Sequence, residues 1–84
     1  MTEDAERQAK LETLARLKQM GEKAYDDMYE AHDFRAGDNF YRDAKEYFYD
    51  AIGLAKRLGL NEEAEALHER LWHIKQVYWH QFAR

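Results

Sequence analysis

The chain has 84 residues, of which 36% are charged and 14% are aromatic, and its formal net charge at pH 7 is −4. The length predicts one domain, and the charge argues against a general binder of nucleic-acid backbones, which needs a basic face. Cysteine and serine do not occur, which excludes a disulfide framework, excludes cysteine-based zinc sites and leaves few nucleophiles for covalent catalysis.

The sequence shows no targeting or membrane signal. No apolar run approaches the roughly 18 residues that a membrane span needs. The first residues, M-T-E-D-A-E, are acidic and lack the basic and apolar regions of a signal peptide. The absence of cysteine also fits a reducing compartment. We therefore expect a cytoplasmic protein that binds no membrane, no nucleic acid and no cofactor.

The first predicted helix covers about residues 3–32. Its apolar residues recur at helical spacing, with Gly21 in the middle of their face: Leu11, Leu14, Leu17, Ala24, Tyr25 and Met28. Tyr29 lies beside this face and is expected in the core. The pattern fails before Leu11, so residues 1–10 are expected to form a solvated, fraying extension of a single helical domain at 11–84.

The second predicted helix covers about residues 40–58. The stretch from Asp33 to Asn39 contains Gly-Asp-Asn, which is typical of a turn, so Asp38 or Asn39 is expected as the N-cap. The apolar face of this helix is wide enough to contact two neighbours. Gly59 should end the helix in a left-handed conformation.

The third predicted helix covers about residues 62–82, with Asn61 as its N-cap. Its core edge repeats at intervals of three and four: Ala64, Leu67, Leu71, Ile74, Tyr78 and Phe82 (or Gln81). Short connections imply antiparallel neighbours. The sequence thus predicts an all-α fold of three helices in an antiparallel up-down-up arrangement.

Several short motifs resemble the tetratricopeptide repeat (TPR). A44-K-E-Y-F48-Y-D-A51 resembles the signature of the second helix of the repeat, M20-G-E-K-A24-Y25 the Leu-Gly-x-x-Tyr element of the first, and G37-D-N-F-Y-R-D-A44 its turn. The resemblance covers about one and a half repeats. It implies a helical hairpin, followed here by a third helix, that makes protein–protein contacts without catalysis.

The third helix also carries a second apolar strip, which is the first candidate site. Trp72 and Trp79 project off the core edge, beside His68 and Lys75. Either the long first helix covers the two indoles, or they form a surface for a second copy or another protein, since tryptophan and tyrosine dominate interaction hot spots. Tyr49 projects from the polar face of the second helix and is added to this partner surface.

A metal site is the alternative. Glu69, His73 and His80 share one side of the third helix, but the two histidines are two turns, or about 10 Å, apart along the helix axis. No metal is therefore assigned. The leading hypothesis is a small, non-catalytic, TPR-like protein-interaction module that forms a homodimer, and the alternative is a metal- or ligand-responsive helical protein.

Overall fold

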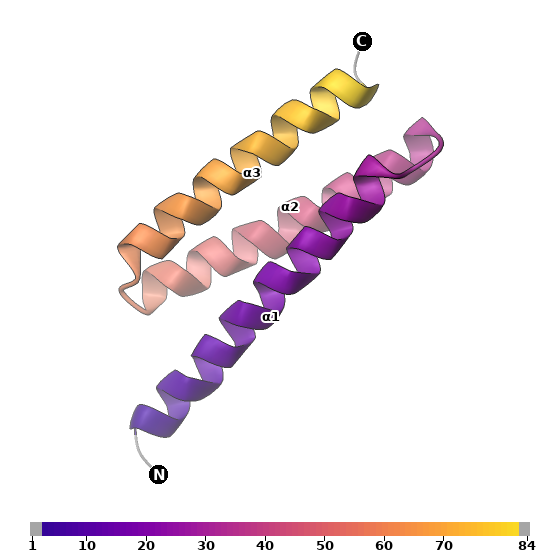
Figure 1. Cartoon of the computed structure of the whole chain (residues 1–84). Coiled ribbons are helices and arrows are strands. Elements are labelled where there is room, and N and C mark those ends of the chain that lie inside the picture. The colour runs from indigo at the N-terminus through magenta and orange to yellow at the C-terminus, as the bar shows by residue number, and fades with distance from the viewer. Residues whose placement is uncertain (1–2, 83–84) are drawn as a thin grey trace.

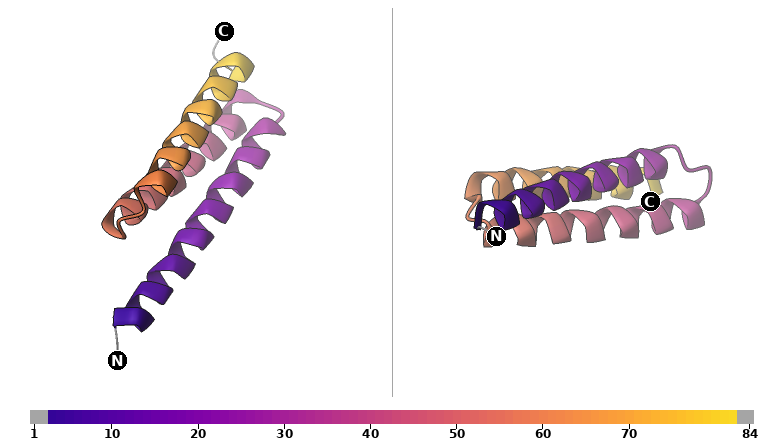
Figure 2. Two further views of the ribbon diagram at one scale, coloured as in Figure 1. Left: turned by 60° about the vertical axis from the view of Figure 1, so that its left-hand side comes forward. Right: turned by 90° about the horizontal axis from the view of Figure 1, so that it is seen from below.

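The computed structural model describes residues 3–82 and confirms the all-α prediction (Figure 1). Three helices alternate in direction: α1 (Glu3–Tyr29), α2 (Phe34–Arg57) and α3 (Asn61–Phe82). The view from below shows two layers, with α1 and α3 side by side over α2 (Figure 2). Helix α2 is therefore the central helix, as the width of its apolar face predicts.

The core is formed mainly by α2 and α3 and is apolar throughout the described residues. Phe48, Met28, Leu71 and Ile74 are its largest fully buried side chains. Phe48 packs against Gly21, where an added Cβ would lie 2.7 Å from the ring carbon Cε2 of Phe48. The missing side chain of Gly21 therefore lets α1 approach α2 closely.

Helix α2 begins at Phe34, and the prediction that it begins at about Phe40 is wrong. Its N-cap is Asp33, which accepts a 2.8 Å hydrogen bond from the backbone N–H of Ala36. The stretch interpreted as a turn is helical because the ring of Phe82 packs directly over Gly37, which is buried. Asp38 and Asn39 therefore lie in the first turns of α2 and do not cap it.

Helix α2 ends as the sequence predicts. Gly59 has a φ angle of 77°, and the backbone N–H of Leu60 donates to the carbonyl oxygen of Ala55 at 2.9 Å. Together with the bond from Gly59 to Lys56, this is the hydrogen-bond pattern of a Schellman cap. Leu60 packs against the core, so α3 returns along α2.

Helix α1 differs from the prediction at its C-terminal end. It ends at Tyr29, two to three residues early, and the ring of Tyr29 is exposed rather than in the core. Residues 3–10 are helical and exposed, and residues 1 and 2 of the predicted extension lie outside the described residues. Within residues 3–82, every helix is too short or too polar to cross a membrane.

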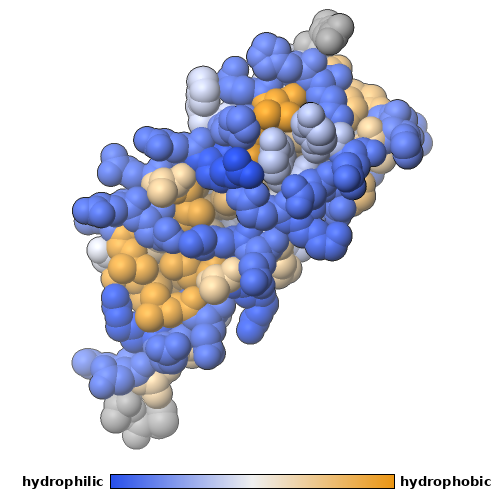
Figure 3. Space-filling model, viewed as in Figure 1, coloured by the Kyte–Doolittle hydropathy of each residue, from blue (hydrophilic) through white to orange (hydrophobic). Residues whose placement is uncertain are grey.

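Helices α1 and α3 diverge toward the beginning of α1 (Figures 1 and 2). The face of the molecule in this view is mostly polar, with an apolar patch over the region where the two helices separate (Figure 3). The two helices are thus held together chiefly through α2 and through the polar contacts described below.

Candidate interaction surface

The two tryptophans are exposed and α1 does not cover them. Trp72 is 64% and Trp79 is 59% accessible to solvent. Arg70 marks the side of α3 that faces α1, because it binds Glu22 of α1. The tryptophans follow Arg70 by two and nine residues, so they lie roughly 180–200° around the helix axis from it. The interpretation that the first helix covers the indoles is therefore wrong.

Tyr49 lies on the same side of the molecule as the tryptophans. Lys75 connects them: its Nζ donates a 2.8 Å hydrogen bond to the hydroxyl of Tyr49 and lies 5.2 Å from the centre of that ring. Lys75 follows Trp72 by three residues and precedes Trp79 by four, so the three side chains share one side of α3. We call this surface, made of Tyr49, His68, Trp72, Lys75 and Trp79, the aromatic face.

Two buried tyrosine rings stack on each other between α2 and α3. Tyr41 of α2 and Tyr78 of α3 are parallel within 5°, with ring centres 3.9 Å apart. The hydroxyl of Tyr78 donates to Asp38 at 3.0 Å. Burial raises the pKa of both tyrosines, and for Tyr78 the hydrogen bond to Asp38 raises the pKa further. The stack fixes the register of α3 on α2.

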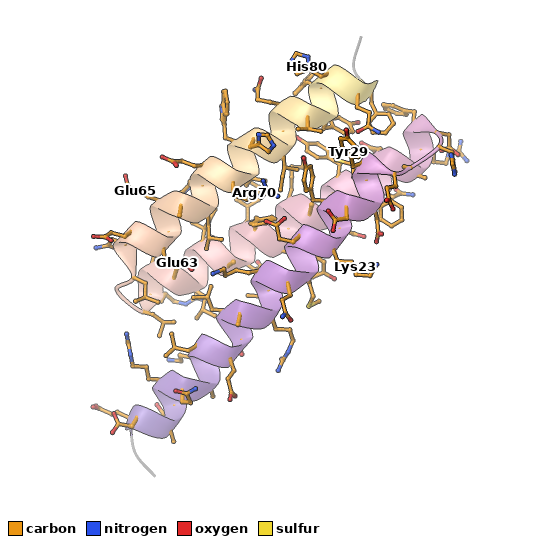
Figure 4. All side chains as sticks on the ribbon, viewed as in Figure 1. Lys23, Tyr29, Glu63, Glu65, Arg70 and His80 are labelled. Atoms are coloured by element: carbon orange, nitrogen blue, oxygen red, sulfur yellow. The ribbon has the colours of Figure 1, made fainter. Side chains whose placement is uncertain are left out.

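The opposite side of α3 forms a polar seam with α1. Arg70 binds Glu22 through two hydrogen bonds of 2.7 Å, which raise the pKa of the guanidinium, and Lys18 pairs with Glu63 at 2.6 Å. Arg70 and Glu63 both point from α3 toward α1 (Figure 4). These four side chains hold α3 against α1 and are defined here as the seam.

Glu69, His73 and His80, the candidate metal ligands, do not come together in the structure. His73 packs its ring edge-on against Tyr25, with ring centres 6.3 Å apart, and His80 points away from the other helices (Figure 4). Among residues 3–82, no group of three or more His, Asp or Glu side chains is arranged to hold a metal ion. Glu69, His73 and His80 therefore stay separate.

Two surface hollows are of interest. The larger, of about 990 Å³, is lined by residues between Ala15 and Glu30, in α1 and directly after it. The smaller, of about 340 Å³, lies where the back of α2 meets α1 and includes Tyr49, Asp50, Gly53 and Leu54. It adjoins the aromatic face through Tyr49.

Two parts of this surface are not predicted by the sequence. The sequence places Lys75 beside the tryptophans but does not predict its contact with Tyr49, because a side-chain contact between two helices depends on their register. Gly53 was not singled out. Its signal is a glycine in the middle of an otherwise strong helix, one turn after an unexplained tyrosine.

The chain was compared with models of protein families, with curated proteins and with solved structures, and no match was found.

Proposed function

We propose that this protein is a small, non-catalytic protein-interaction module that associates with a second copy of itself through the aromatic face. The observation that carries the proposal is the exposure of Trp72 and Trp79, one heptad apart on α3. Exposed large aromatic rings that gather on one side of a protein often mark an interaction site, and tryptophan and tyrosine are enriched in hot spots.

The hairpin of α1 and α2 supports a TPR-like module within this proposal. Gly21 of α1 and Ala44 of α2 are both buried, and the ring of Phe48 fills the space beside Gly21. A small residue of α1 against a large ring of α2 supports the TPR-like part of the proposal. The proposal includes no cofactor and no catalytic step, and it places the protein in the cytoplasm because the chain lacks cysteine.

Sedimentation analysis of the wild type and two variants tests the proposal. We expect the mean mass of the wild type to rise toward that of a dimer with concentration. Trp72→Ala and Trp79→Ala should each shift this rise to higher concentration, while the stability of the monomer changes by no more than about 0.5 kcal/mol, as for other surface substitutions.

A core substitution provides the control. Leu71 lies between the tryptophan side and the seam and is buried, so Leu71→Ala should lower the free energy of unfolding by about 2–5 kcal/mol. If the tryptophan variants lose stability in the same way and associate as the wild type does, the indoles serve the fold and the proposal fails.

A further inference from the structure

The part of the aromatic face that lies on α3 has the same spacing in both directions along the helix. His68, Trp72, Lys75 and Trp79 follow one another at intervals of four, three and four residues, so they share one side of α3. His68 and the two tryptophans are exposed, and Lys75 is half-buried. These four side chains lie outside the hydrophobic core. We call them the α3 strip.

This spacing makes the α3 strip complementary to a reversed copy of itself. Two α3 helices that pack antiparallel are related by a twofold axis that runs between them, perpendicular to both and within the plane of contact. If the axis passes midway between Trp72 and Lys75, Trp72 comes level with Lys75 of the second copy. Trp79 comes level with His68 of the second copy by the same symmetry. Each tryptophan therefore meets a nitrogen-bearing side chain and not another tryptophan.

The chemistry of these pairs is favourable. An ammonium group is attracted to the face of an aromatic ring, and tryptophan is the best partner. Tyr49 already holds the ammonium of Lys75 beside the strip, because its hydroxyl accepts a 2.8 Å hydrogen bond from Nζ. Less freedom of Lys75 is then lost when a second copy binds. The ring of His68 can stack on the flat indole of Trp79.

The charges of α3 favour antiparallel over parallel pairing. All carboxylates of this helix precede Arg70: Glu62, Glu63, Glu65 and Glu69. In a parallel pair, Glu65, Glu69 and Lys75 would each lie level with the same residue of the second copy, which places like charges together. The antiparallel pair separates them. It also brings Glu69 of each copy to within about 5 Å, along the axis, of the level of Lys75 of the other.

We infer that two copies associate through an antiparallel contact between their α3 helices, with Trp72 against Lys75 of the second copy and Trp79 against His68 of the second copy. The same patch is used on both copies, so the contact closes as a symmetric dimer. This inference rests on the proposed function and specifies the orientation and the register of the two chains.

Distances between spin labels test this arrangement. The chain has no cysteine, so Glu62→Cys and His80→Cys each accept a single label, at exposed positions outside the α3 strip. In the proposed dimer the two labels are separated along the helix axis by about 35 Å for Glu62→Cys and by about 20 Å for His80→Cys. Pulsed dipolar electron resonance at a concentration where the dimer predominates measures both separations.

The two separations identify the orientation and the register independently. Equal separations in the two variants would show parallel helices and overturn the inference. The expected difference between them is about 15 Å, whereas an antiparallel pair with Trp72 against Trp79 of the second copy would give about 27 Å. The larger difference would overturn the register.

Lys75→Met tests the chemistry of the contact. Methionine keeps an unbranched apolar side chain but removes the charge, so the dissociation constant of the dimer should rise at least about fivefold in sedimentation equilibrium. Lys23→Met is the control, because Lys23 pairs with Asp27 within α1, and it should leave the dissociation constant unchanged. An unchanged dissociation constant for Lys75→Met would contradict the inference.

The outcomes separate this inference from the proposed function. If Trp72→Ala and Trp79→Ala weaken the dimer while the spin labels show parallel helices, the aromatic face is the interface and the inference is wrong. A wild type that stays monomeric at every concentration overturns both.

Discussion

Gly21 and Gly53 lie in the interiors of helices but have opposite surroundings. At Gly21 an added Cβ would lie 2.7 Å from the ring of Phe48, which is buried. We predict that Gly21→Ala lowers the free energy of unfolding by about 1–3 kcal/mol, the usual cost of overpacking a core, although alanine is the better helix former. Urea denaturation measures this change.

Gly53→Ala is the matched control for that experiment. It makes the same chemical change in a helix where the space is open, so it should raise the free energy of unfolding of the monomer by about 0.5–1 kcal/mol. Equal effects at both positions would mean that Phe48 does not limit the approach of α1 to α2.

The tyrosine stack makes stability depend on pH in the alkaline range. Burial raises the pKa of Tyr41 and Tyr78 above the ordinary value of 10.0, so the folded state keeps its protons longer than the unfolded state. The stabilisation is therefore complete below about pH 10 and is lost as the pH rises toward the higher pKa of the folded state.

Tyr41→Phe tests this dependence. We predict that the free energy of unfolding of this variant falls less steeply than that of the wild type between about pH 9 and pH 11, because the phenol that resists ionisation is gone. Urea titrations at a series of pH values measure the slope. Tyr29→Phe, at an exposed ring, is the control, and an identical slope in Tyr41→Phe would contradict the prediction.

At the scale of the helix, the seam holds α3 to α1 with ion pairs at its surface. Arg70 and Glu22 are about two-fifths exposed, so solvent weakens their attraction, and we predict that Glu22→Gln lowers the free energy of unfolding by no more than about 1 kcal/mol. The loss should shrink as salt screens the pair. Thermal melts at low and high salt measure both effects.

Lys23→Gln is the control for the seam. Lys23 pairs with Asp27 within α1 and is 78% exposed, so its removal should have a smaller effect than that of Glu22→Gln. A larger loss for Lys23→Gln would show that the pair between α1 and α3 does not contribute as described.

The ends of the helices show which local signals the sequence carries. The end of α2 could be predicted because a Schellman cap depends on Gly59 and its neighbours alone. The beginning of α2 could not, because Gly37 is helical through its contact with Phe82, which is 45 residues later in the chain. Asp33 followed by Phe34 was an equally good local start signal, and only packing selects it.

At the scale of the whole molecule, helical periodicity predicted the separate strips of side chains on α3, but not which strips the other helices cover. It separated the core edge from Trp72 and Trp79. It left open whether α1 covers the indoles, because that depends on the rotation of α3 about its own axis relative to α1. Arg70 binds Glu22 of α1. The tryptophans lie on the opposite side of α3 from Arg70, so they point away from α1.

The tertiary contacts also explain why Tyr49 joins the aromatic face. Its position on α2 predicted exposure, but its hydrogen bond with Lys75 depends on the register between α2 and α3. The hollow over Gly53 likewise involves side chains from two helices. Such features depend on how the helices pack together, so they cannot be predicted from the pattern of one helix at a time.

Tryptophan fluorescence over a dilution series of the wild type tests the central claim most directly, because both tryptophans of the chain lie on the aromatic face. If a second copy covers that face, the emission maximum should move to shorter wavelength as the mean mass rises from monomer to dimer. An emission maximum that stays constant while the mass doubles, or a mass that never rises, would contradict the account.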